Sequence, residues 1–225
     1  MRFKRKNIIG MSNMFFSCTS LIELNTSKFI TDNVTFMRNM FYQCSSLKKL
    51  NLSNCNTHKV INMHGMFFGC SSLEELNLSG FNTKKVNDMS YMFFGCSSLK
   101  ELNLSNFSNN NVSNMSYMFD GCSSLREINF TNFNTNNVTN MSYMFKGCSS
   151  LQILNLSNFN TEKVNNMESM FYKCSSLIDL DISNFNLDNI NNMNFIFRDI
   201  PEVLKFKLMN QKNIIKNYNP SNYYY

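Results

Sequence analysis

Seven cysteines recur at a constant interval of 26 residues, without one insertion or deletion between them. Each is followed by Ser-Ser-Leu or Thr-Ser-Leu. The seven are Cys18, Cys44, Cys70, Cys96, Cys122, Cys148 and Cys174. A fixed period of about 20 to 50 residues is typical of a solenoid, in which each repeat forms one coil and contacts only its neighbours. The spacing therefore predicts one stack of coils across most of the 225 residues.

Apolar residues fall in columns when the repeats are aligned. The unit reads M-F-x-x-C-S-S-L-x-x-L-x-L-S-x-F-x-T-x-x-V-x-x-M-x-x, and its apolar positions are nearly unbroken. Of the 17 methionines, 15 lie in two columns, one from Met11 to Met193 and the other from Met14 to Met170. A methionine-rich surface can bind partners, but methionine fixed in a column beside phenylalanine indicates packing. We therefore predict that these columns form the core.

Two local patterns alternate within each repeat. In LEELNLSGF, Leu76 and Leu78 alternate with polar residues, which is typical of a strand with one buried face. The following apolar residues have the spacing of an amphipathic helix; they are Val86, Met89, Met92, Phe93 and Cys96. Thr83 suits the N-cap of this helix, and the glycines suit a left-handed C-cap position. These glycines are Gly69, Gly95, Gly121 and Gly147.

The two ends of the sequence keep the register of the repeat. Phe3, Ile8 and Met11 occupy repeat columns of a leading half coil. Val203, Phe206 and Leu208 occupy the three leucine columns after the seventh full coil, which predicts a capping strand. We therefore expect one solenoid over residues 1–208 and a polar, disordered tail over residues 209–225.

The formal net charge of +6 is concentrated at the two ends of the chain. Residues 1–10 contribute +4, residues 11–200 contribute 13 minus 14, or −1, and residues 201–225 contribute +3. Since no basic face follows the repeat, nucleic-acid binding is not predicted. No run approaches the roughly 18 apolar residues of a membrane helix, and the N-terminal MRFKRKNIIGMSN has no apolar core typical of a signal peptide. Neither membrane insertion nor a signal peptide is predicted.

The cysteine column has two interpretations. Neighbouring coils at strand spacing would bring the cysteine Cα atoms to about 5 Å, within the range of a disulfide. Stacked side chains point in parallel, however, so we favour buried free thiols. Such thiols suit a reducing compartment, or a surface protein whose thiols are inaccessible.

Catalytic and metal sites find little support in the sequence. Cys55, His58, His64 and Cys70 are the one place where histidine and cysteine cluster, but their spacing matches no zinc pattern and Cys70 belongs to the core column. The recurrent acidic residues form a periodic outward column rather than a converging pair. We expect a protein that is not an enzyme and has no cofactor.

The segment L-x-x-L-x-L-x-x-F resembles the strand motif of leucine-rich repeats. The fuller unit, NMSYMFKGCSSLQILNLSNFNTEKV at residues 140–164, is similar to the BspA-like leucine-rich-repeat surface proteins, and the match covers roughly residues 3–208. The resemblance implies an α/β fold, a right-handed solenoid with one short parallel strand and one helical segment per coil. It also implies a cell-surface or secreted protein used for adhesion to host or neighbouring-cell proteins.

The outward strand positions are where such a solenoid would bind a protein. We predict a binding face made of Lys48, Lys49, Asn51, Glu74, Glu75, Asn77, Lys100, Glu101, Asn103, Arg126, Glu127 and Asn129. The asparagines have a second, structural interpretation, which is mutual amide hydrogen bonding between coils.

The leading hypothesis is a monomeric protein-binding module, used in adhesion, whose protein ligand the sequence does not identify. The alternatives are an intracellular interaction scaffold and a structural spacer or fragment of a longer surface protein.

Overall fold

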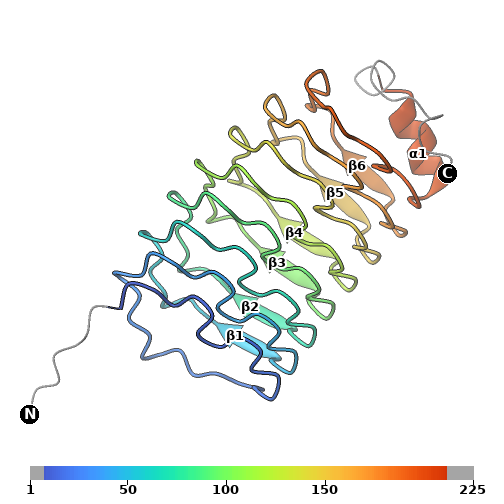
Figure 1. The fold of residues 1–225 in the computed structure, drawn as a ribbon. Coiled ribbons are helices and arrows are strands. Elements are labelled where there is room, and N and C mark those ends of the chain that lie inside the picture. Colours follow the sequence, from blue (N-terminus) through green and yellow to red (C-terminus); the bar gives the residue numbers. More distant parts are fainter. Residues whose placement is uncertain (1–7, 212–225) are drawn as a thin grey trace, which may run out of the picture.

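The computed structural model describes residues 8–211, which form a solenoid of stacked coils with a helix at its C-terminal end (Figure 1). The strands lie side by side along the stack. They are β1 (Lys49–Asn51), β2 (Glu75–Asn77), β3 (Glu101–Asn103), β4 (Glu127–Asn129), β5 (Ile153–Asn155) and β6 (Asp179–Asp181). Helix α1 (Glu202–Met209) follows β6. The predicted leucine-rich-repeat solenoid is confirmed.

The strands pair in parallel with the register of the repeat. β1 pairs with β2, β3 with β4 and β5 with β6, and each residue faces the residue 26 positions along, as Leu50 faces Leu76. Glu23 extends this row by a single bridge to Lys49. Since successive side chains of a strand point to opposite faces, Leu102 of β3 is buried while Glu101 and Asn103 are exposed. The predicted inward and outward positions of the strands are confirmed.

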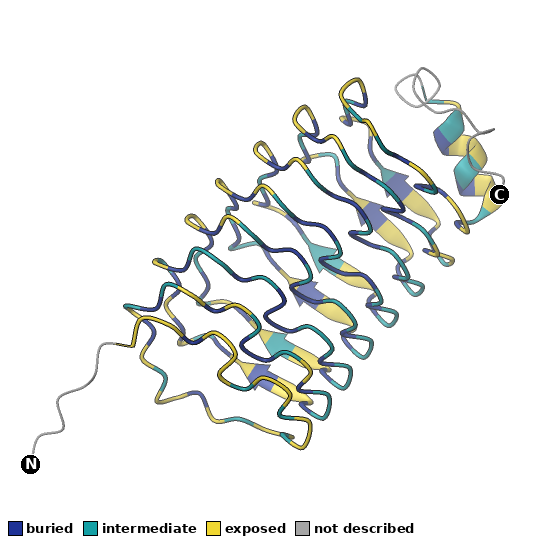
Figure 2. Cartoon of the chain, in the orientation of Figure 1, coloured by how far each residue is buried: buried dark blue, intermediate teal, exposed yellow. Residues whose placement is uncertain are grey.

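The apolar columns form one continuous core along the stack (Figure 2). Phenylalanine rings from Phe15 to Phe197 stack coil upon coil, with centroids 5.2 to 6.0 Å apart. Both methionine columns are buried except for Met14, which is 51% exposed in the first described coil, where no described coil covers it. Each buried side chain therefore packs between neighbouring coils, and the core prediction is confirmed.

The second half of each coil is a run of turns, and the predicted helix is wrong. Alternate backbone N–H groups donate to the next coil, Tyr91 N to Ser116 O at 3.0 Å and Phe93 N to Met118 O at 2.9 Å. In a helix they would donate to the carbonyl four residues earlier. The backbone at Tyr91 and Gly95 is left-handed, with φ of 59° and 68°, which disfavours a right-handed helix. Hydrogen bonds between coils therefore satisfy the backbone N–H groups that a helix would have paired within itself.

Thr83 does not cap a helix either, because the threonine column joins neighbouring coils. Thr57 Oγ1 donates to Asn82 O at 2.9 Å and accepts from Asn82 N at 2.7 Å. Thr83 Oγ1 in turn donates to Asn109 Oδ1 at 3.0 Å and accepts from Ser108 N at 2.9 Å. Both threonines are buried, so each satisfies backbone groups inside the stack.

The predicted C-terminal capping strand is also wrong, since α1 occupies this segment. Leu204 and Leu208 are buried, whereas Val203 is 86% exposed and Phe206 is 73% exposed. A spacing of four residues puts Leu204 and Leu208 on one face of a helix. Pro201 lacks an N–H group and fits the start of a helix, where that group would have no partner in any case. A helix also satisfies its own backbone, whereas a final strand would leave one edge unpaired.

The predicted ends of the solenoid are described only in part. Phe3 and residues 212–225 lie outside the described residues, so the leading half coil is seen from Ile8 onward and the predicted tail only as far as Gln211. Within residues 8–211, no helix has the length and apolar character needed to cross a bilayer.

Candidate functional site

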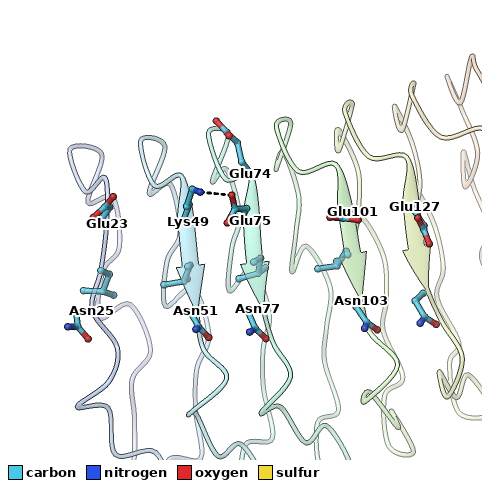
Figure 3. A pocket seen from close by; sticks show the side chains of 15 residues that line it. Glu23, Asn25, Lys49, Asn51, Glu74, Glu75, Asn77, Glu101, Asn103 and Glu127 are labelled. Atoms are coloured by element: carbon cyan, nitrogen blue, oxygen red, sulfur yellow. Dashed lines mark ion pairs between the residues drawn. The ribbon is translucent and has the colours of Figure 1, made fainter.

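The strand face is the outward side of β1 to β6 together with Glu23 and Asn25 of the first coil. The twelve predicted binding residues all lie on β1 to β4 or on the residue directly before each strand, and all are exposed except Asn129, which is half-buried. Side chains from successive coils therefore form parallel rows on one side of the molecule (Figure 3).

An open hollow of about 850 Å³ runs across this face. Nine of the twelve predicted residues line it: Lys49, Asn51, Glu74, Glu75, Asn77, Glu101, Asn103, Glu127 and Asn129. Lys48, Lys100 and Arg126 do not line it. Glu23 and Asn25 also line the hollow but are absent from the predicted set, although they occupy the same repeat columns.

The lining of the hollow is acidic. Five glutamates, Glu23, Glu74, Glu75, Glu101 and Glu127, stand against one lysine, Lys49. Lys49 Nζ lies 2.5 Å from Glu75 Oε1, and this contact raises the pKa of Lys49. Both side chains are well exposed, so their ion pair contributes little to stability. One lysine thus stands against five carboxylates, and only Glu75 forms an ion pair with it, so the lining favours a ligand with positive charge.

The outward asparagines hydrogen-bond within their own coil. Asn51, Asn77 and Asn103 each accept, through Oδ1, a hydrogen bond of 3.0 Å from the backbone N–H two residues later. This contact turns the chain at the end of each strand. Within residues 8–211 these amides do not bond to one another, so the proposed mutual bonding between coils is not what the structure shows. Their Nδ2 groups donate to no described residue and are available to a ligand.

Aspartate replaces asparagine in this column at β6. Asp181 Oδ1 accepts hydrogen bonds from the hydroxyl and the backbone N–H of Ser183, at 2.7 and 3.0 Å. These bonds lower the pKa of Asp181. The column of outward asparagine side chains therefore ends in a carboxylate at β6.

All eight cysteines are free thiols, in agreement with the favoured interpretation. From Cys44 to Cys174 in the column, each Sγ donates to the backbone carbonyl of the phenylalanine 29 residues earlier, at 3.1 to 3.3 Å. Burial raises the pKa of Cys44 to about 11 and that of Cys122 to about 12. Protonated thiols without solvent access are poor nucleophiles, so the column from Cys44 to Cys174 is structural.

The four residues considered for a metal site do not converge. Cys55 is buried in the core, and Cys70 Sγ contacts Phe41 O at 3.1 Å. His58 Nδ1 lies 2.7 Å from Asn56 Oδ1, while His64 Nδ1 lies 2.8 Å from Ser90 Oγ. Across residues 8–211, no group of three or more histidine, cysteine or acidic side chains could hold a metal ion.

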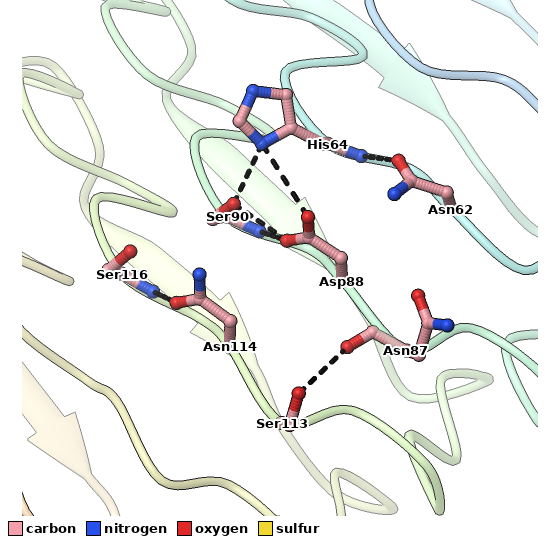
Figure 4. A network of polar contacts seen from close by, with 8 residues as sticks. All are labelled: Asn62, His64, Asn87, Asp88, Ser90, Ser113, Asn114 and Ser116. Carbon is pink, nitrogen blue, oxygen red and sulfur yellow. Dashed lines mark hydrogen bonds and ion pairs between the residues drawn. The ribbon is translucent and has the colours of Figure 1, made fainter.

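His64, Asp88 and Ser90 form a polar network on the turn side of the coils (Figure 4). Ser90 Oγ donates to Asp88 Oδ1 at 2.6 Å, and His64 Nδ1 lies 2.8 Å from Ser90 Oγ and 3.7 Å from Asp88 Oδ2. A catalytic triad places histidine between the other two residues and uses both ring nitrogens. Here both contacts are made by Nδ1, and Ser90 is 3% exposed. The network joins two coils and does not activate a nucleophile.

Comparison with known proteins places the repeat in a family. Residues 9–131 and 97–211 match the family model described as "Mycoplasma protein of unknown function, DUF285". No curated protein matches the sequence.

Several solved bacterial structures are similar. A leucine-rich cell surface protein of Faecalibacterium prausnitzii is 22% identical with a TM-score of 0.47, and the alignment covers 73% of this chain and 43% of that one. A leucine-rich-repeat protein of Eubacterium ventriosum is 17% identical with a TM-score of 0.41, covering 76% and 36%. One from Bacteroides ovatus is 15% identical with a TM-score of 0.44, covering 89% and 55%. This chain thus spans about half or less of each, and the expected resemblance to bacterial leucine-rich-repeat proteins is confirmed.

Proposed function

Because the chain belongs to the DUF285 family, whose description assigns no function, we propose from its own geometry that it binds protein through the strand face. The core columns repeat almost unchanged from coil to coil, whereas the outward positions directly before and within the strands change in charge. Lys48, Glu74, Lys100 and Arg126 illustrate this in a single column. A constant core that carries a varied exposed face is the usual arrangement for specific binding by a solenoid.

The observation that carries the proposal is the hollow over the first five coils. It is broad and open, and its carboxylates and asparagine side chains come from successive coils. Small-molecule sites, by contrast, bury most of their ligand in an enclosed and mainly apolar pocket. The hollow therefore suits an extended protein segment that contacts several coils at once.

A capture experiment followed by charge reversal tests this proposal. The full chain would be used to isolate a partner from the native cells, and the purified partner would then be titrated against the variants. Glu75→Lys, Glu101→Lys and Glu127→Lys together should weaken binding at least about tenfold, because they reverse the charge of the lining. Lys48→Glu with Arg126→Glu tests the neighbouring column.

Glu162→Lys is the matched control, because Glu162 is exposed and lies outside the strand face. Its affinity for the partner should equal that of the native chain. If the native chain, the control and the lining variant bind the partner with equal affinity, the strand face is excluded as the binding site.

Adhesion is the more specific form of the proposal, supported by the resemblance to surface proteins. Fractionation of the native cells and labelling of intact cells by an impermeant reagent would test it. Recovery of all the protein from the cytosol would favour the intracellular scaffold, an alternative that the free thiols also suit.

A further inference from the structure

Three tyrosines on the turn side of the coils stack on one another. Tyr91, Tyr117 and Tyr143 occupy one repeat column in consecutive coils, and no other described coil has tyrosine in this column. Their ring centroids are 4.5 Å apart at each step, with interplanar angles of 7° and 5°. All three side chains are half-buried, so solvent reaches part of each ring. We call this row the tyrosine ladder.

The hydroxyl group at one end of the ladder has a proton acceptor. The hydroxyl of Tyr143 donates to Glu168 Oε1 at 2.5 Å. Glu168 Oε2 accepts from Asn192 Nδ2 at 3.0 Å, which holds the carboxylate in place. Burial and the hydrogen bond to Glu168 raise the pKa of Tyr143, so the phenol keeps its proton at neutral pH. Once the ring loses an electron, a carboxylate at this distance can accept the proton.

Packing alone does not require the hydroxyl groups of the ladder. In a neighbouring column, Phe68 and Phe94 stack at the same centroid distance of 4.5 Å, with an interplanar angle of 8°. Phenylalanine therefore makes the same ring contact without a hydroxyl. Tyrosine beside Glu168 adds a phenol next to a base, and this is the arrangement in which loss of an electron is coupled to loss of a proton.

Lys146 also lies near the oxidisable end of the ladder. Its Nζ is 5.4 Å from the centroid of the Tyr143 ring, and a cation in this position opposes loss of an electron from the ring. Lys146 Nζ is also 3.3 Å from Asp120 Oδ2, and Asp120 is itself buried. This carboxylate offsets the charge of the lysine. Transfer of the phenol proton to Glu168 then leaves a neutral radical on Tyr143 instead of a second cation.

We propose that the tyrosine ladder is a site of oxidative modification, at which a one-electron oxidant joins Tyr117 to Tyr143 by a carbon–carbon bond. Glu168 accepts the phenol proton of Tyr143. The oxidant belongs to the class of haem peroxidases that turn over hydrogen peroxide. The bond joins residues 26 positions apart in neighbouring coils, so it fastens one coil to the next. This inference is independent of the proposed function, which uses the strand face.

The electrons and protons of this reaction balance. Each ring gives one electron to the oxidant and loses its phenol proton, that of Tyr143 to Glu168 and that of Tyr117 to water. The two phenoxyl radicals form one bond between ring carbons adjacent to the carbons that bear oxygen. Each of these ring carbons loses its hydrogen as a proton and each oxygen regains one, which restores both phenols. The two electrons and two protons released in sum reduce one hydrogen peroxide to two waters.

The other two tyrosines within residues 8–211 have different surroundings. Tyr42 stacks between Phe16 and Phe68, with centroids 4.7 and 4.4 Å away, and neither neighbour can form a phenoxyl radical. Tyr172 lies beside the guanidinium of Arg198, whose Cζ is 5.8 Å from the ring centroid. This cation opposes oxidation of the ring. The ladder is therefore where we expect the bond to form.

Photo-oxidation of the purified full chain, followed by peptide mapping, tests the inference. Tris(bipyridine)ruthenium with light and persulfate supplies the one-electron oxidant, and dilute protein limits bonds between molecules. Trypsin cuts after Lys100 and Arg126, so Tyr91, Tyr117 and Tyr143 leave on separate peptides. The expected product joins the peptides of Tyr117 and Tyr143, and its mass is lower than their sum by the mass of H₂.

Three variants examine the role of each group. Tyr117→Phe should abolish the joined peptides while keeping the ring in the stack. Tyr42→Phe is the matched control and should leave their yield unchanged, because Tyr42 has phenylalanine on both sides. Glu168→Gln keeps an oxygen that accepts from Tyr143 but removes the base, so the joined peptides should form at least about tenfold more slowly. Circular dichroism of each variant verifies that the stack is folded.

Several results would overturn the inference. Oxidised tyrosines without the joined peptides would do so, as would bonds that connect different molecules or that involve only the tyrosines of residues 212–225. Equal rates in Glu168→Gln and the native chain would overturn the assigned proton transfer. The capture experiment on the strand face decides the proposed function separately, because its variants leave the ladder unchanged.

Discussion

At the scale of single residues, the most demanding positions are those with left-handed backbone. The sequence predicts it at Gly69, Gly95, Gly121 and Gly147, and φ values of 67° to 75° confirm it, although no helix ends there. At the same place in other coils, Gln43 and Lys173 have φ of 55° and 61°. These two could not be predicted, because the stack imposes a conformation that neither side chain favours.

Replacement of Gln43 by glycine should therefore stabilise the protein by about 0.5 to 1 kcal/mol. Left-handed backbone costs a non-glycine residue roughly 1 to 2 kcal/mol, and the greater freedom of unfolded glycine offsets about 0.5 to 1 kcal/mol of the relief. Gly95→Ala should have the opposite effect. Urea denaturation followed by circular dichroism measures both.

The control for this prediction is Gln152→Gly, at an exposed position without positive φ. It should destabilise the protein by about 0.5 to 1 kcal/mol, because only the unfolded chain gains freedom. If Gln43→Gly loses as much stability as Gln152→Gly, strain at Gln43 is excluded.

At the scale of elements, the alternation of apolar and polar residues predicted the strands correctly. Apolar residues spaced three to four apart predicted a helix that does not form. Val86, Met89, Met92 and Phe93 are buried as expected. Their spacing fits turns as well as a helix, and hydrogen bonds to the neighbouring coil, which act over 25 residues, decide between them. The reverse error occurs at the C-terminus, where Phe206 and Leu208 fit the leucine columns of a strand but belong to α1.

Truncation within α1 distinguishes the helix from the predicted strand. Leu204→Ala should destabilise the protein by about 2 to 3 kcal/mol, because it removes a side chain that is 3% exposed. Val203→Ala should change stability by less than about 0.5 kcal/mol, since Val203 is exposed. Urea denaturation and amide exchange of α1 measure the difference. A larger loss of stability in Val203→Ala than in Leu204→Ala would instead support the predicted capping strand.

At the scale of the whole molecule, the repeat fixes which columns face outward but not where the hollow lies. Glu101 and Asn103 could be predicted as exposed because their neighbours Leu102 and Leu104 are core positions. Lys100 shares that exposure and yet does not line the hollow. The shape of the face depends on how coils stack and on the direction of each long side chain, and the period of the sequence contains neither.

The buried thiols make the stability of the whole stack sensitive to alkaline pH. Burial raises the pKa of Cys44 and Cys55 from 9.0 to about 11, and that of Cys122 and Cys174 to about 12. The unfolded chain therefore loses these protons at lower pH than the folded chain. The stabilisation is complete below about pH 9 and is lost as the pH rises toward 11 to 12.

At about pH 10, each such thiol should lower the free energy of unfolding by on the order of 1 kcal/mol relative to neutral pH. The urea midpoint, measured at about pH 7.5, 9 and 10, should thus be steady at first and then fall. Cys122→Ser is the control, because its hydroxyl can keep the hydrogen bond to Phe93 O without titrating in this range. Its midpoint should fall less than that of the native chain. An equal fall in both proteins would assign the effect to other groups, such as Tyr143, whose pKa is also raised by burial.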